Sequence, residues 1–185
     1  MPNLLVEEIR HYVAIAGVVT DSVSGRAIVG AIVEILDPKR CTLTRADGSF
    51  YFIDLPVGSY SLNIAPPSLN SRYGSINDLI IPVQNNEKGK PILDPKAKVQ
   101  LVPTTLTGQV VRADNSKPIG GAIVQLRRGE MQTITDKEGR YRLSGLLSGK
   151  PTIQVTTKGF SKSVQTVVLT AGQTTTADFN LSAIS

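Results

Sequence analysis

The side chains that most often perform catalysis are scarce in this sequence. Histidine, which moves protons in Ser/His/Asp and Cys/His hydrolases, occurs once, as His11. Cysteine also occurs once, as Cys41, so no disulfide bond can form within the chain. We interpret His11 as a surface or edge-strand residue and Cys41 as a passive strand or turn residue. The sequence therefore predicts no catalytic residues and no enzyme activity.

Metal binding has little support in the residue types. Zinc or iron needs several converging His, Cys or carboxylate ligands, which one His and one Cys cannot supply. Calcium binds loop oxygens, and Asp21, Asp47 and Asp54 lie where turns are expected. Because these aspartates show no regular acidic loop spacing, turn formation is the favoured interpretation, and a weak calcium site is left open. We expect no metal and no cofactor.

Positive charge is concentrated in the second part of the chain. The net charge is +5; residues 1–102 hold ten basic and ten acidic residues, and residues 103–185 hold ten and five. A candidate basic contact patch, which requires that its strands be neighbours, consists of Arg127, Arg128, Arg140 and Arg142. Binders of single-stranded nucleic acid interleave aromatic with basic residues, and only Tyr141 is nearby. We expect no nucleic acid; a solvated mixed surface is favoured, and an acidic protein partner is the second interpretation.

The elements that must position these residues occur in two copies. Residues 15–19 (IAGVV) return as residues 106–110 (LTGQV), and residues 30–33 return as residues 121–124, both displaced by 91 positions. The displacement stays constant over roughly fifty residues, as expected for a repeated module. Residues 97–101 resemble residues 177–181 at a displacement of 80, so the first copy carries about eleven extra residues within 85–96.

Each copy is expected to contain about seven short strands. In the second copy we expect strands at residues 105–112, 122–128, 132–135, 141–143, 152–157, 163–169 and 174–181. Alternation directs Ala31, Val33 and Ile35 to one face and leaves Ile32 and its counterpart Ile123 on the other. Ile32 and Ile123 then either cover a second apolar surface or form part of an interface.

Four glycines mark the expected structural turns. Gly48 and Gly139 follow acidic residues where a hairpin needs a positive φ, which glycine adopts without steric cost. Gly58 and Gly149 occupy a second pair of matching turn positions.

The repeated unit resembles a known family. Residues 17–35 (GVVTDSVSGRAIVGAIVEI) and 44–62 (TRADGSFYFIDLPVGSYSL) resemble a carboxypeptidase regulatory-like domain of transthyretin-like fold. The second copy keeps the pattern but has Pro151 where the first has Tyr60, so its strand is expected to begin later. The resemblance implies an all-β protein of two tandem antiparallel Greek-key β-sandwiches of about seven strands each. It implies no catalytic residues, because in the carboxypeptidases the chemistry belongs to a separate domain.

Pilin-like sandwiches that resemble this fold carry Lys–Asn isopeptide bonds. Asn180 lies on the expected last strand, but residues 105–112 contain no lysine, so we expect no such cross-link.

We place the two domains at residues 1–102 and 103–185, with residues 1–14 as an N-terminal arm or extra strand. This arm is a candidate for pairing with another subunit, and residues 85–96 are a second candidate contact.

The location and partners of the chain are expected from what its sequence lacks. No stretch approaches the roughly 18–20 apolar residues of a membrane span, and the first residues do not read as a signal peptide. We therefore expect no membrane insertion and a cytoplasmic location.

The favoured function is a non-catalytic structural or interaction protein that docks into a larger protein assembly, for example a phage-tail-like contractile injection particle. The alternative is a surface adhesion or carbohydrate-binding module; the partner's identity and the oligomeric state are left open.

Overall fold

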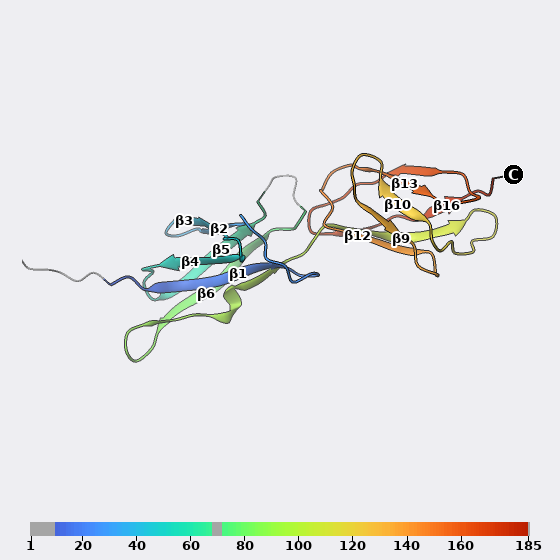
Figure 1. The fold of residues 1–185 in the computed structure, drawn as a ribbon. Helices are drawn as coiled ribbons and strands as arrows, with labels where there is room; N and C mark the ends of the chain where they lie inside the picture. The colour runs from blue at the N-terminus through green and yellow to red at the C-terminus, as the bar shows by residue number, and fades with distance from the viewer. Residues whose placement is uncertain (1–9, 68–71, 185) are drawn as a thin grey trace, which may run out of the picture. The chain divides into compact units, whose positions relative to one another are not determined.

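The computed structural model describes residues 10–67 and 72–184, which form β-strands and one 3₁₀ helix at Pro95–Ala97. These residues divide into two compact units (Figure 1). Unit 1 contains residues 10–20, 25–65 and 76–100, and unit 2 contains residues 21–24, 66–67, 72–75 and 101–184. The predicted all-β class with two sandwiches is confirmed. The division into domains 1–102 and 103–185 follows the sequence repeat and stays a proposal.

Unit 1 consists of two sheets with a core between them. The three-stranded sheet has the order β4-β1-β8, from Ser49–Ile53, Val13–Asp21 and Lys98–Leu101. The five-stranded sheet has the order β3-β2-β5-β6-β7, from Arg40–Leu43, Ile32–Ile35, Gly58–Ala65, Ile76–Asn85 and Pro91–Ile92. Ala31, Val33 and Ile35 are fully buried, as their alternation predicted, because every second side chain of a strand faces the core.

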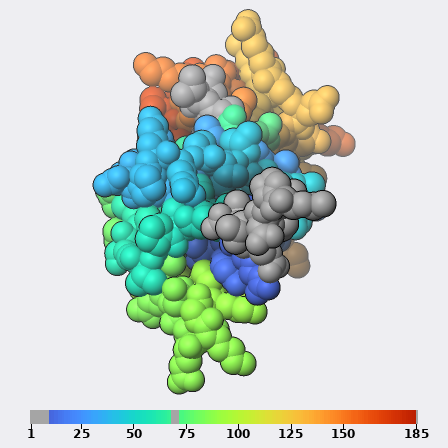
Figure 2. All heavy atoms as spheres, turned by 90° about the vertical axis from the view of Figure 1, so that its left-hand side faces the viewer, coloured from blue at the N-terminus to red at the C-terminus, as the bar shows by residue number. Residues whose placement is uncertain are grey.

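The extra residues of the first copy extend the five-stranded sheet. Strands β6 and β7 pair antiparallel, and the turn between them is closed by a hydrogen bond from the Asn86 N–H to the Lys90 carbonyl oxygen at 2.8 Å. This hairpin projects from unit 1 in the space-filling view (Figure 2). The 3₁₀ helix that follows leads into β8. The insertion predicted within residues 85–96 is thus located in the β6–β7 turn and the segment before β8.

Unit 2 repeats the two-sheet arrangement. One sheet has the order β11-β10-β13-β14, from Gln132–Ile134, Ile123–Leu126, Thr152–Thr156 and Ser163–Thr166. The other has the order β12-β9-β15, with β16 also paired to β9, from Arg140–Ser144, Thr105–Arg112, Thr174–Thr176 and Phe179–Leu181. Strand β13 begins at Thr152 whereas its counterpart β5 begins at Gly58, which confirms the later start predicted from Pro151.

The last predicted strand of unit 2 is divided in two. Both β15 and β16 pair with β9 in parallel, and Ala177 and Asp178 separate them. The Asp178 carboxylate accepts a hydrogen bond from the Gln109 N–H at 2.8 Å, so a side chain replaces the ladder at the break. The Tyr141 hydroxyl donates to the Ala177 carbonyl oxygen at 2.6 Å and fixes the same point from the core side.

Turn positions follow the repeat. Gly48 and Gly139 have φ values of 76° and 72°, which confirms the positive φ predicted for both. The turns that contain them join strands of different sheets rather than forming hairpins within one sheet, because β3 and β4, like β11 and β12, belong to separate sheets. Gly149 has a φ of 132°, whereas Gly58 opens β5 without a positive φ.

Candidate interaction surfaces

Unit 1 carries an exposed apolar row on the outer face of its five-stranded sheet. Ile32 on β2 lies directly opposite Leu43 on β3 and opposite Ala65 on β5. Ile32 is 39% exposed and Leu43 is 58% exposed, although both side chains are large and aliphatic. We call these three residues the apolar row of unit 1. Ile32 therefore lies on the surface of unit 1, as its interpretation as part of an interface requires.

Unit 2 carries the same row at the same repeat positions. Ile123 on β10 lies opposite Ile134 on β11 and opposite Thr156 on β13. Ile123 is 37% exposed and Ile134 is 64% exposed. We call Ile123 and Ile134 the apolar row of unit 2, since its third position holds the polar residue Thr156. All three positions are displaced by 91 residues from those of unit 1, so the exposed aliphatic pair occurs in both modules.

The apolar rows run to terminal strands of their sheets. Strand β3 ends the five-stranded sheet of unit 1, and β11 ends the four-stranded sheet of unit 2. A terminal strand presents backbone N–H and C=O groups that another chain can pair with. A partner that adds a strand at such an edge would also cover the neighbouring aliphatic side chains. Each module therefore offers backbone pairing and apolar contact at one place.

Two of the predicted basic residues border the apolar row of unit 2. Arg140 and Arg142 lie on β12 and line a shallow hollow of about 400 Å³ that Ile134 also lines. The Asp136 carboxylate at this hollow accepts a hydrogen bond from the Arg140 N–H at 2.7 Å. Neither guanidinium group forms an ion pair within the described part of the chain, and both are exposed. This end of the apolar row is therefore suited to an acidic partner.

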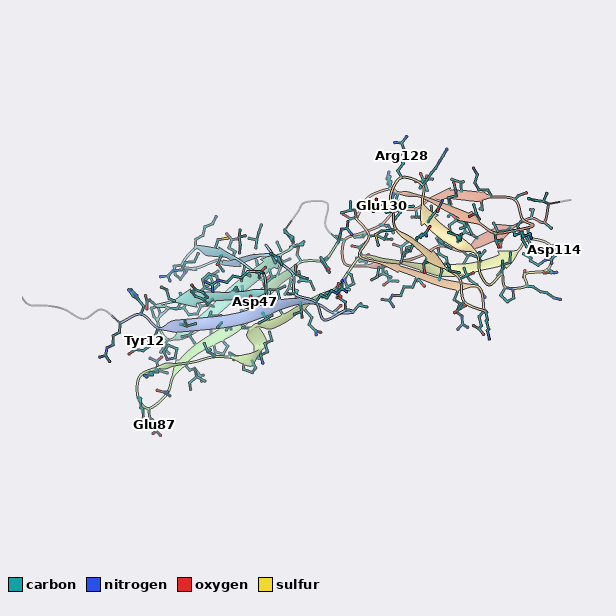
Figure 3. All side chains as sticks on the ribbon, in the orientation of Figure 1. Tyr12, Asp47, Glu87, Asp114, Arg128 and Glu130 are labelled. Atoms are coloured by element: carbon teal, nitrogen blue, oxygen red, sulfur yellow. The ribbon has the colours of Figure 1, made fainter. Side chains whose placement is uncertain are left out.

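The other two predicted basic residues lie elsewhere in unit 2. Arg127 and Arg128 belong to the loop between β10 and β11, and Figure 3 shows Arg128 projecting away from the sandwich. Strands β10 and β12 belong to different sheets, so the neighbouring-strand premise of the single basic patch is not met. The four arginines therefore border two separate hollows, one beside the apolar row and one at the end of β10.

The aspartates considered as calcium ligands act as acceptors in turns. The Asp21 carboxylate accepts from the Val23 N–H at 2.7 Å and the Asp47 carboxylate accepts from the Ser49 N–H at 2.9 Å. Among the described residues, no group of three or more His, Cys, Asp or Glu side chains is placed to hold a metal ion. These contacts support the turn interpretation for both aspartates.

Asp54 and the single histidine meet at the start of β1. The Asp54 carboxylate hydrogen-bonds His11 Nδ1 and accepts from the Tyr12 N–H at 3.0 Å. These two hydrogen bonds hold the pKa of the Asp54 carboxyl below its usual value, and the hydrogen bond from His11 has the larger effect. His11 is exposed, and its contact with Asp54 lies at the surface. The pair therefore fastens the beginning of β1 to the turn after β4.

Residues 1–9 of the predicted arm lie outside the described residues.

Sequence reasoning missed part of both surfaces. Leu43 and Ile134 were not singled out, although each stands on an apolar position that recurs at the displacement of 91 residues. Cys41, which was assigned to a strand or turn, is an exposed free thiol on β3.

No described helix has both the length and the apolar character needed to cross a membrane.

Both the sequence pattern and the fold define tandem modules of one β-sandwich class. The carboxypeptidase regulatory-like domain family matches residues 14–78 and again residues 105–182. The chain therefore belongs to the carboxypeptidase regulatory-like domain family and carries two matches to it, as the resemblance predicted. No curated protein sequence matches the chain.

Several solved structures are similar to the chain at low identity. The Bacillus anthracis TIE protein is 16% identical with a TM-score of 0.49, over 94% of this chain and 34% of that one. GBS52, the minor pilin of Streptococcus agalactiae, is 14% identical with a TM-score of 0.39, over 92% and 96%. Shaft pilin SpaA of Lactobacillus rhamnosus GG is 11% identical with a TM-score of 0.41, over 95% and 98%. The chain thus spans about a third of the TIE protein's length. These likenesses say nothing about what the chain binds.

Proposed function

We propose that the chain is a non-catalytic structural or interaction protein that docks into a larger protein assembly through the apolar rows of its two units. The observation that carries this proposal is the recurrence of one exposed aliphatic pair beside a terminal strand. The pair is Ile32 with Leu43 in unit 1 and Ile123 with Ile134 in unit 2. Docking needs no catalytic group, and the family that the chain belongs to is named for a regulatory domain.

The energetics of the rows suit protein docking. Removing a large aliphatic side chain from water contributes about 1.5–3 kcal/mol when the whole side chain is covered. The four aliphatic side chains are already partly covered by the sheet, so each contributes less than that amount. Strand addition at β3 or β11 supplies backbone hydrogen bonds as well, and these set the register of the partner. Two equivalent surfaces let one chain contact two neighbouring subunits.

The setting that we propose is a phage-tail-like contractile injection particle assembled in the cytoplasm. Such particles are built from many repeated subunits, so a chain with two equivalent docking surfaces can join neighbouring ones. Cys41 supports the cytoplasmic placement, because it is an exposed free thiol and a reducing compartment keeps such a thiol from oxidising. Arg140 and Arg142 favour a partner surface that carries carboxylates.

A surface adhesion or carbohydrate-binding module is the second candidate function. Its specific support is Tyr51, which is exposed at the surface of unit 1 and could stack on a sugar ring. The Arg45 guanidinium, however, lies 4.6 Å from the centre of that ring and also donates to its hydroxyl at 2.7 Å. One face of the ring is therefore already occupied, which makes protein docking the better supported function.

The test is site-specific photo-crosslinking in the cell that naturally makes the protein. A photoreactive phenylalanine analogue replaces Leu43 or Ile134 in the full chain at native expression level. The matched controls are Val57 and Val168, which are exposed aliphatic residues outside the apolar rows. We expect one or a few recurring protein adducts from Leu43 and Ile134 that co-sediment with a large particle.

Two outcomes would overturn the docking function. One is a chain that sediments as a free monomer and gives no adduct at the apolar rows. The other is an identical set of adducts at Leu43 and at the control Val57. Specific retention on a glycan array without protein adducts would favour the carbohydrate-binding function instead.

A further inference from the structure

Unit 2 contains a hollow at one end of its sandwich that is separate from the apolar row. The hollow has a volume of about 680 Å³ and lies between the β10–β11 loop and the segment that enters β13. Its apolar lining consists of Leu126, Met131, Leu146, Leu147 and Pro151. A second hollow of about 580 Å³ adjoins it and shares Leu126, Arg128, Lys150 and Pro151. We call the two together the cationic hollow.

The cationic hollow exists because the repeat lacks one aromatic ring. In unit 1 the position that matches Pro151 holds Tyr60, which is 7% exposed and donates its hydroxyl to the Pro56 carbonyl oxygen at 2.8 Å. Ile35, at the end of β2 in that unit, is fully buried. Its counterpart Leu126 is only half-buried. The smaller Pro151 ring therefore leaves apolar surface uncovered where Tyr60 completes the core of unit 1.

The rim of the hollow is strongly basic. Arg127, Arg128 and Lys150 are exposed there, and their side chains make no ion pair with any described residue. Arg72 also lines the hollow, with its guanidinium donating to the Gly145 carbonyl oxygen at 3.1 Å. The only carboxylate among the described lining residues is Glu130, in the same loop as Arg128 (Figure 3). The hollow is therefore suited to a ligand with an apolar side chain next to several carboxylates.

The chain itself contains one segment with this chemistry. Glu7 and Glu8 are the only two consecutive acidic residues in the sequence, and Leu4, Leu5 and Val6 precede them. The segment lies outside the described residues and belongs to the predicted N-terminal arm. Its aliphatic residues match the apolar lining at Leu126 and Pro151 in chemistry, and its two carboxylates are opposite in charge to Arg128 and Lys150. Charge complementarity of this kind selects one partner over others.

We propose that the cationic hollow of unit 2 binds residues 4–8 of a second copy of the chain. The arm and the hollow are different surfaces, so the contact is heterologous and joins copies head to tail. Self-association goes beyond the proposed function, which concerns docking on other subunits through the apolar rows. The two can fail separately, since different residues carry them.

Reciprocal charge reversal in the full chain tests the proposal. Variant A carries Glu7→Lys and Glu8→Lys, and variant B carries Arg128→Glu and Lys150→Glu. In sedimentation velocity we expect wild type to associate with rising concentration and each variant alone to associate at least tenfold more weakly. An equal mixture of A and B should regain association, because each arm then meets a hollow of opposite charge. The matched control is Lys117→Glu with Lys158→Glu, which makes the same change in net charge at exposed sites elsewhere in unit 2.

Carbodiimide crosslinking identifies the contact. It should join Glu7 or Glu8 to Lys150, and a mixture of ¹⁴N- and ¹⁵N-labelled chains should give crosslinked peptides of mixed isotope composition. Crosslinks within one isotope only would show that the arm folds back on its own unit 2, which would overturn binding between copies. Wild type that remains monomeric at every concentration, or variant B associating as wild type does, would also overturn the proposal.

Discussion

Thr44 and Ala31 are joined within unit 1 by a hydrogen bond from the Ala31 N–H to the Thr44 hydroxyl oxygen at 2.8 Å. The same hydroxyl donates to the Ile28 carbonyl oxygen at 2.6 Å, so one buried side chain both accepts and donates. Thr135 makes the matching two hydrogen bonds in unit 2, at 2.9 and 2.7 Å. These bonds fix the segment that leads into β2 or β10, and thereby hold each apolar row in place.

Replacing Thr135 by valine should destabilise unit 2. The change keeps the shape of the side chain but removes the hydroxyl partner of the Ala122 N–H and the Ile119 carbonyl inside the sandwich. Leaving a buried polar group unsatisfied costs about 1–3 kcal/mol. Urea unfolding of the full chain, followed by the unit 2 amide signals in NMR spectra, measures the loss. The exposed control Thr166→Val should stay within about 0.5 kcal/mol of wild type. Equal losses in the two variants would contradict the role of the hydroxyl.

Replacing Gly108 by alanine should separate β9 from β15 and β16. A Cβ atom at Gly108 would lie within 1.9 Å of the Ala177 carbonyl oxygen, so the backbone must move. We expect a loss of about 3 kcal/mol in the free energy of unfolding, at the upper end of overpacking effects. Gly58→Ala is the control, because its Cβ would meet no atom closer than 3.8 Å. Amide hydrogen exchange of residues 105–112 should rise in the Gly108 variant alone; unchanged protection would refute the close-approach explanation.

Much of the fold could be predicted because its signals are local. A residue's alternation along one strand decides which face it occupies, so Val33 and Ile35 were correctly assigned to the core. A positive φ depends on the turn itself, so Gly48 and Gly139 were also correctly assigned. The constant displacement of 91 residues then transfers each local result from one module to the other.

The candidate surfaces were harder to predict because they depend on which strands become neighbours. Arg128 follows β10 and Arg142 lies on β12, and these two strands belong to different sheets. The parallel pairing of β15 with β9 joins residues about seventy positions apart, and no local signal specifies it. The hollow at Pro151 arises from a side chain that is missing, and its size becomes apparent only when the surrounding loops are placed.

The hydrogen bonds of Asp54 should contribute stability that depends on pH. Because His11 and the Tyr12 N–H hold its pKa below 3.8 in the folded state, the contribution is complete above the unfolded pKa. It is lost as the pH falls through the lower folded pKa. Carboxyl ¹³C NMR should give Asp54 a titration midpoint below 3.8, and the Tyr12 amide shift should follow it. The variant Asp54→Asn should abolish this dependence of the Tyr12 shift. A midpoint at or above 3.8 would show that the contact does not persist in solution.

Substitutions in the apolar rows should impair docking while leaving folding intact. Leu43→Ser combined with Ile134→Ser removes exposed aliphatic surface, so the free energy of unfolding should change by less than about 0.5 kcal/mol per site. The loss of two apolar contacts, each worth roughly 1 kcal/mol because the sheet already covers part of both side chains, should weaken binding to the assembly at least about tenfold in co-sedimentation.

The matched control for this pair is Val57→Ser combined with Val168→Ser, because both valines are as exposed as the residues in the rows. The control should sediment with the assembly as wild type does. If the row variant also co-sediments at the wild-type level, the aliphatic pairs are ordinary exposed residues, and docking must use another surface. If both variants lose co-sedimentation, the contact extends over the outer surfaces of both units. Only the selective loss identifies the repeated pair, beside the terminal strands β3 and β11, as the docking site.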